Sequence, residues 1–241
     1  MVNQMKILQP KEFDTLSEAD CIKIQEMLST KVVQHSSFAM DTLVRVAGVD
    51  LAYWMEEDQE MAVCCIVVID CKTKEILERQ HSVGKVRFPY IPGCLAFREL
   101  PLVIETAAKL RQKPDVFLFD GNGILHPRGM GLATHASFYL KAPTLGVAKK
   151  YFHVDNAEFL MPENLAGSYS DIVKDGHILG RAIRTHQDVK PVFASVGNEI
   201  DIDMVTQLVI KFTELESHIP IPTRYADLQT HVEREKYRKV Q

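Results

Sequence analysis

Three acidic residues stand where the surrounding sequence is apolar. Asp50 and Asp120 each follow a strand-like apolar run, and Glu99 lies within an apolar, helix-like segment. If the three carboxylates converge, each pair ~5 Å apart repels by about 3 kcal/mol at an effective dielectric of ~20. Such a cluster must take up protons or bind a cation, and all-oxygen ligands suit Mg²⁺ or Mn²⁺ better than Zn²⁺. The corresponding chemistry is metal-assisted attack of water on a phosphodiester. From spacing alone, separate carboxylates at strand and helix ends are the simpler explanation.

The apolar pattern predicts a mixed sheet that positions these residues. Three strands, expected at residues 43–54, 61–71 and 74–86, form an antiparallel meander. The middle strand is apolar throughout, which is typical of a strand buried on both faces. The next strand, Val116–Phe119, is expected beside the first one, and this would bring Asp50 and Asp120 together.

Strands and helices alternate in the second half of the chain. Strand, helix and strand follow at 116–119, 132–140 and 144–147, a βαβ unit with parallel strands. Other helices are expected at 17–33, 94–111 (interrupted at Pro101) and 202–215, and other strands at 177–185 and 192–196. We therefore expect one domain over residues 1–241. Its class is α/β, with a mixed central sheet of an antiparallel meander plus parallel βα strands, flanked by helices.

The composition excludes several classes of protein. With 46% hydrophobic and 25% charged residues, the chain has ample apolar content for a core. The longest apolar run, Met61–Ile69, is too short for a membrane span of about 20 residues, and the first residues lack the apolar segment of a secretory signal. Five cysteines without a C-x-x-C spacing disfavour zinc and redox sites. We expect a cytoplasmic protein, and the net charge of −4 indicates no generally basic surface for nucleic acid.

Four motifs follow one another along the chain. They are Val-Ala-Gly-Val-Asp at 46–50, Phe-Pro-Tyr-Ile-Pro-Gly at 88–93, Asp-Gly-Asn-Gly-Ile-Leu-His-Pro-Arg at 120–128 and Pro-Thr-Leu-Gly-Val-Ala-Lys-Lys at 143–150. In this order and spacing they resemble the endonuclease V family of deoxyinosine 3′ endonucleases. The resemblance implies a ribonuclease H-like fold and hydrolysis of the second phosphodiester 3′ of a deaminated purine, leaving a 3′-OH and a 5′-phosphate. It also implies Mg²⁺ as cofactor, with Mn²⁺ as a substitute.

The resemblance assigns roles to particular side chains. The catalytic residues would be Asp50, Glu99, Asp120, Lys149 and His126, and the first three would also be the metal ligands. Lys149 would hold the scissile phosphate or the attacking water. His126 would contact phosphate or water at the metal, although a histidine before a proline is, by itself, more often a hydrogen-bond partner within its loop.

Residues Pro89, Tyr90, Ile91 and Pro92 look like the wedge of the family. Two prolines stiffen such a loop, and apolar wedges unstack bases at a cost of a few kcal/mol. A rigid apolar loop packed on the core explains the same residues without the resemblance. The flipped base would enter a pocket whose backbone and apolar walls are expected from Gly93, Leu95, Gly121, Leu132 and Ala148.

Some features leave alternatives open. The run 195–198 ends in Asn198, where the family commonly has a histidine near the metal, so the number of metal ions is undecided. Arg224 and Asp227 receive no assignment. We expect a monomer, away from membranes, that binds DNA containing deoxyinosine, with RNA or single strands as further ligands. The alternatives are an inosine-specific ribonuclease, another ribonuclease H-like nuclease acting on branched DNA, and a lesion binder without catalytic activity.

Overall fold

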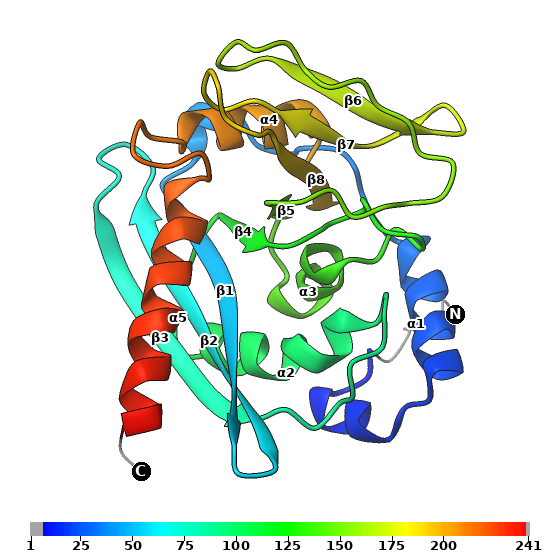
Figure 1. Ribbon diagram of the computed structural model, residues 1–241, viewed down its shortest axis with the longest axis vertical. Helices are drawn as coiled ribbons and strands as arrows, with labels where there is room; N and C mark the ends of the chain where they lie inside the picture. The colour runs from blue at the N-terminus through cyan, green and yellow to red at the C-terminus, as the bar shows by residue number, and fades with distance from the viewer. Residues whose placement is uncertain (1–6, 240–241) are drawn as a thin grey trace.

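Eight strands form one sheet in the computed structural model, which describes residues 7–239 (Figure 1). Their order across the sheet is β3-β2-β1-β4-β5-β8-β7-β6. In chain order they are β1 (Arg45–Glu56), β2 (Gln59–Asp70), β3 (Ile76–Lys85), β4 (Val116–Asp120), β5 (Thr144–Ala148), β6 (Tyr169–Lys174), β7 (His177–Ile183) and β8 (Val192–Asn198). The first three form the expected antiparallel meander, and β1, β4 and β5 are parallel neighbours. The predicted fold class is confirmed.

The register between β1 and β4 brings two of the predicted site residues together. These strands pair in parallel up to Val49 and Phe119, so Asp50 and Asp120 are the next residue on each strand. Neighbouring strands lie about 4.8 Å apart. The predicted adjacency of the first and fourth strands therefore places the two carboxylates side by side at the end of this pairing.

Helices cover both faces of the sheet, as Figure 1 shows. The short 3₁₀ turns η1 (Pro10–Thr15) and η2 (Met40–Thr42) accompany α1 (Glu18–Ser29), α2 (Leu95–Ala107), α3 (Leu132–Leu140), α4 (Ile202–Lys211) and α5 (Ile221–Lys239). On one face, Val49 and Phe119 pack with the side chains of α2 and α3, including Phe97. On the other face, Val46 and Leu118 pack with α4 and the first turns of α5. Since side chains alternate along a strand, Asp50 and Asp120 point to the α5 face.

A glycine allows α5 to lie directly on the centre of the sheet. A Cβ on Gly48 would lie 1.9 Å from the carbonyl oxygen of Pro222, which belongs to the first turn of α5. No side chain fits at that distance, so the close approach of helix and strand depends on glycine at this position. Gly48 is two residues before Asp50 and therefore lies on the same face.

The structure corrects three sequence-based expectations. Strand β6 was missed, because only Ile172 among its six residues is buried and the strand forms an edge of the sheet. The α2 helix continues through Pro101 without interruption. The first and fourth helices end at Ser29 and Lys211, earlier than predicted. Isolated apolar residues beyond each helix end account for the overestimate.

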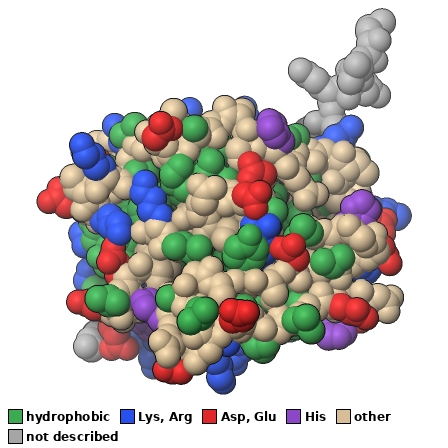
Figure 2. All heavy atoms as spheres, turned by 90° about the horizontal axis from the view of Figure 1, so that it is seen from above, with side chains coloured by type: hydrophobic (Ala, Val, Ile, Leu, Met, Phe, Trp, Pro, Cys, Tyr) green, Lys and Arg blue, Asp and Glu red, His purple; other side chains and the backbone are tan. Residues whose placement is uncertain are grey.

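The surface carries mixed side chains. Figure 2 shows the molecule from above, where apolar side chains are separated by acidic and basic ones. All five cysteines are free and buried. Within residues 7–239, no helix has the length and apolar character needed to cross a membrane.

Candidate active site

The carboxyl ends of β4 and β5 place an ammonium group between carboxylates. Lys149 directly follows β5, and its Nζ lies 2.8 Å from Oδ2 of Asp120. The same Nζ lies 3.6 Å from Oδ2 of Asp227 on α5. The structure therefore brings together Asp120 and Lys149, as predicted, and adds a carboxylate from the C-terminal helix.

Asp227 is a site residue that sequence analysis did not identify. It reaches the sheet because α5 packs across β1 and β2, and this packing depends on Gly48. One turn further along the helix, Nε2 of His231 lies 3.4 Å from Oδ1 of Asp227. The sequence gives one local signal, an acidic residue spaced four residues before a histidine on a helix, and that pattern is common on solvated helices.

Asp50 is the most perturbed carboxyl group of this cluster. Burial, together with the negative charges of Asp120 and Asp227, raises its pKa from 3.8 to about 8, although the Leu51 backbone and Lys149 act in the opposite direction. A carboxyl group with such a pKa keeps its proton at neutral pH unless a cation compensates the charge. The charges of Asp120 and Asp227 are therefore close enough to oppose the ionisation of Asp50.

Glu99 approaches the cluster from the opposite face of the sheet. It lies on α2, is buried, and its Oε1 accepts a hydrogen bond of 2.5 Å from the hydroxyl of Tyr53 on β1. Burial raises the pKa of Glu99 to about 7, with a contribution from the charge of Asp120, while Tyr53 and Arg98 oppose the shift. Of the predicted ligands, Asp50 and Asp120 are neighbours on the sheet, and Glu99 interacts with the second of them.

The donor set fits a hard divalent cation. Asp50, Asp120, Glu99 and Asp227 supply oxygen atoms, which Mg²⁺ and Mn²⁺ prefer. In the described part of the chain, no three His, Cys, Asp or Glu side chains are already arranged as ligands of one metal ion. The ammonium of Lys149 supplies the positive charge between two of these carboxylates. The raised pKa of Asp50 indicates that Lys149 does not fully compensate the negative charge of the cluster, and a bound cation would compensate the remainder.

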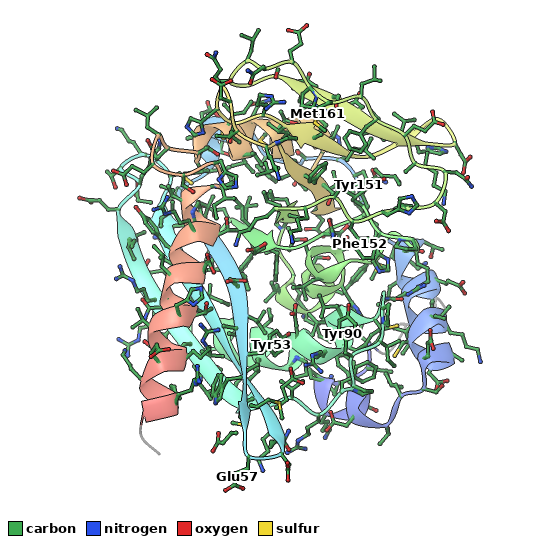
Figure 3. The ribbon with its side chains drawn as sticks, in the orientation of Figure 1. Tyr53, Glu57, Tyr90, Tyr151, Phe152 and Met161 are labelled. Carbon is green, nitrogen blue, oxygen red and sulfur yellow. The ribbon has the colours of Figure 1, made fainter. Side chains whose placement is uncertain are left out.

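A pocket of about 130 Å³ lies next to these carboxylates. Its walls contain seven of the residues predicted to bind substrate, namely Tyr90, Ile91, Pro92, Gly93, Leu95, Gly121 and Leu132. Gly121 directly follows Asp120, so the pocket begins where the carboxylate cluster ends. Phe152, which was not predicted, lines the pocket as well, and Figure 3 shows it on the same side of the molecule as Tyr90.

Two residues predicted to bind substrate lie outside this lining. Pro89 is exposed and precedes the part of the loop that borders the pocket. Ala148 belongs to a separate apolar cluster with Phe193 and Val154. Since Lys149 extends to the α5 face, the preceding residue on the strand points to the other face.

The wedge loop, defined as Pro89–Pro92, is held as a stiff turn. The N–H of Cys94 donates to the carbonyl of Ile91 at 2.9 Å, with Pro92 and Gly93 as the two central residues. Gly93 has φ of +77°, which suits glycine at the second central position of a type II turn. Tyr90 is 69% exposed at the outside of this loop. An exposed aromatic ring on a proline-restricted turn has the properties that a wedge between bases requires.

His126 and Asn198 are both held by hydrogen bonds within the protein. Both ring nitrogens of His126 have partners within the protein: Nε2 contacts the Gly93 oxygen at 3.1 Å, and Nδ1 accepts from the N–H of Arg128 at 3.2 Å. Asn198 pairs with Thr144 at the start of β5, at the opposite end of that strand from Lys149, and its Oδ1 accepts a 2.7 Å bond from the Val33 N–H. Asn198 is therefore a structural residue, and Asp227 is the residue from the C-terminal region that reaches the site.

Comparison with known proteins agrees with this geometry. The sequence model of the family Endonuclease V matches residues 26–228. The chain belongs to the endonuclease V family. Endonuclease V from Bacillus velezensis is 51% identical over 235 residues, covering 98% of this chain and 99% of that protein. The crystal structure of endonuclease V from Bacillus subtilis superposes with a TM-score of 0.93 at 48% identity, covering 98% of this chain and 100% of that one.

A more distant relative has been solved with nucleic acid. Endonuclease V from Ciona intestinalis superposes with a TM-score of 0.82 at 25% identity, covering 92% of this chain and 98% of that one. That structure is a complex with a 24-mer DNA containing an inosine followed by a ribo-adenosine. Endonuclease V proteins are nucleases that act on phosphodiester bonds and use divalent metal ions. The resemblance inferred from the four motifs is confirmed.

Proposed function

We propose that this protein is a metal-dependent DNA repair endonuclease that hydrolyses the second phosphodiester 3′ of deoxyinosine, leaving a 3′-OH and a 5′-phosphate. The observation that carries this proposal is the cluster in which desolvation, together with the charges of Asp120 and Asp227, raises the pKa of half-buried Asp50 to about 8, directly beside a base-sized pocket. The inosine in the Ciona intestinalis complex supports the choice of lesion.

We assign the metal to the carboxylate cluster. Asp50, Asp120 and Glu99 would hold Mg²⁺, or Mn²⁺ as a substitute, and Asp227 would complete the set. When bound, the cation neutralises charge at the scissile phosphate and assists ionisation of the attacking water. The protein's own contribution is to bring carboxylates from four elements close enough to interact electrostatically, and they would become ligands when the cation binds.

Lys149 has the position of an electrostatic catalyst. Its ammonium lies at the end of β5 beside Asp120, and the bonds to this carboxylate raise the pKa of Lys149 despite the opposing effect of burial. The side chain therefore stays charged at neutral pH. We assign it to a non-bridging oxygen of the scissile phosphate, where a fixed positive charge stabilises the developing negative charge of the transition state.

The pocket and the wedge loop would recognise the base before hydrolysis. Tyr90 can stack on the bases that remain in the helix, and such stacking contributes about 1–3 kcal/mol per base. Unstacking costs least for a damaged or mismatched pair, which favours deaminated purines over normal bases. His126 would act in this pocket, through Gly93, rather than at the phosphate.

A nicking assay tests the proposal. Oligonucleotides with one inosine, as DNA and as RNA, and a branched DNA without inosine are incubated with Mg²⁺ or with a chelator. We expect a single Mg²⁺-dependent nick in the inosine-containing DNA, directly 3′ of the nucleotide that follows the lesion. Preferential cleavage of RNA or of the branched DNA would support the alternative nucleases. Inosine-specific binding without any cleavage would identify a lesion binder and overturn the proposal.

We further propose that the protein acts in the cytoplasm as a monomer. Five free, buried cysteines suit a reducing compartment, because they need no disulfide for stability. Sedimentation of the purified protein, alone and with the inosine oligonucleotide, would test the monomer.

A further inference from the structure

One backbone carbonyl next to the wedge loop accepts hydrogen bonds from three side chains. The Gly93 oxygen lies 2.8 Å from Nε2 of Gln25, 2.8 Å from Nη2 of Arg128 and 3.1 Å from Nε2 of His126. Gln25 belongs to α1, whereas His126 and Arg128 belong to the loop after β4. We call these three side chains the Gly93 clamp. The clamp joins three segments that are far apart in the sequence.

The donors of the clamp are themselves held in place. Nε of Arg128 donates to Oε1 of Gln25 at 2.6 Å, and Gln25 is buried. Nδ1 of His126 accepts from the backbone N–H groups of Arg128 and Met130 at 3.2 and 3.4 Å, so Nε2 carries the hydrogen that faces Gly93. Burial and the charge of Arg128 lower the pKa of His126 to about 4, so the ring stays neutral at physiological pH. The clamp therefore keeps one arrangement of donors.

The clamp joins the two walls of the base pocket. Tyr90 and Gly93 belong to one wall, and His126 and Gly131 belong to the other. Glycine is required at the joint, because φ is +77° and a Cβ there would lie 2.7 Å from Nη2 of Arg128. Three hydrogen bonds at one point of contact restrict the separation of the walls, and a pocket of about 130 Å³ discriminates by fit only if that separation is constant.

We propose that Gln25, on the N-terminal helix, is a specificity-determining residue: through the Gly93 clamp it sets the width of the base pocket and thereby the preference for inosine over normal bases. This inference rests on the function proposed above. Gln25 is a positioning residue, since it acts through Gly93 and does not line the pocket. Gln25 lies outside the four sequence motifs of the site, so the motifs alone do not identify it.

The test compares the binding preference of three variants. Gln25→Met keeps the size of the side chain and removes its hydrogen bonds with Gly93, Met130 and Arg128. Gln25→Glu keeps the acceptor for Arg128 but removes the donor to Gly93 and Met130. Glu26→Ala, an exposed neighbour on α1, is the matched control. Dissociation constants are measured by fluorescence anisotropy for two DNA duplexes that differ only in one inosine or adenosine, with Ca²⁺ in place of Mg²⁺. Thermal melting of each variant, and kcat and KM on inosine DNA with Mg²⁺, are measured in parallel.

For both Gln25 variants we expect the preference for inosine to fall about tenfold, the effect of roughly one lost hydrogen bond. KM for inosine DNA should rise more than kcat falls, and Glu26→Ala should match the wild type. A purely structural role would lower the melting temperature and the active fraction but leave the preference unchanged, and that result would overturn the inference. A wild-type protein without any preference for inosine would instead refute the proposed function.

Discussion

Replacing Asp50 by asparagine should stabilise the metal-free protein at alkaline pH while abolishing cleavage. Asp50 has a pKa near 3.8 when exposed to water but about 8 in the folded protein, owing to burial and the charges of Asp120 and Asp227. The folded state therefore binds a proton that the unfolded state releases. The stability that this proton contributes is fully present below about pH 4 and is lost as the pH rises through about 8.

The magnitude follows from the linkage between proton binding and folding. Between about pH 6 and about pH 8, ionisation of Asp50 removes about 2 kcal/mol of unfolding free energy, and Glu99, whose pKa is raised to about 7, removes about 1 kcal/mol. Over this pH interval the wild type should lose both contributions to its unfolding free energy, whereas Asp50→Asn should lose only the contribution of Glu99. The difference of about 2 kcal/mol corresponds to roughly 4–8 °C in melting temperature for a chain of this size.

Urea denaturation in EDTA at the two pH values measures this effect. Trp54 is the only tryptophan and is buried in β1, so its fluorescence reports unfolding directly. Asp155→Asn, at an exposed aspartate, is the control and should keep the pH dependence of the wild type. Cleavage by Asp50→Asn should fall at least about 100-fold, since a metal ligand is lost. If Asp50→Asn shows the same loss of stability with pH as the wild type, the clustering of carboxylates inferred here is wrong.

Three other substitutions test the elements around the cluster. Gly48→Ala places a Cβ 1.9 Å from an α5 carbonyl oxygen, so the unfolding free energy should fall by about 2–3 kcal/mol and the cleavage rate should fall as well. An unchanged midpoint of urea denaturation would contradict this packing of α5 on β1. Tyr53→Phe removes the donor to Glu99 and should raise the Mg²⁺ concentration for half-maximal cleavage about tenfold, with kcat at saturating Mg²⁺ nearly retained. Lys149→Met should lower kcat about 100-fold or more, with a smaller change in KM. Cleavage assays over a range of DNA concentrations measure both constants, and an unchanged kcat would contradict the electrostatic role of Lys149.

Much of the sheet and three residues of the carboxylate cluster, Asp50, Glu99 and Asp120, could be predicted from the sequence. Asp50 and Asp120 each follow an apolar run, and such a run predicts a buried strand from its own residues, without information from the rest of the chain. The βαβ rule then makes the later strands parallel, and the observed register sets the two carboxylates side by side. The stiffness of the wedge loop also follows from local chemistry, because proline restricts φ in any context.

Only the tertiary structure decided which distant side chains join the site. Asp227 reaches Lys149 because α5 lies on Gly48, and His126 contacts Gly93 because the loop after β4 is hydrogen-bonded to the turn that precedes α2. Asn198 is carried to the far end of β5 by the antiparallel pairing of β8, which its own motif does not indicate. Local propensity and periodicity describe each segment in isolation. Contacts between segments depend on packing distances of a few ångströms, which are set only when helices and sheet come together.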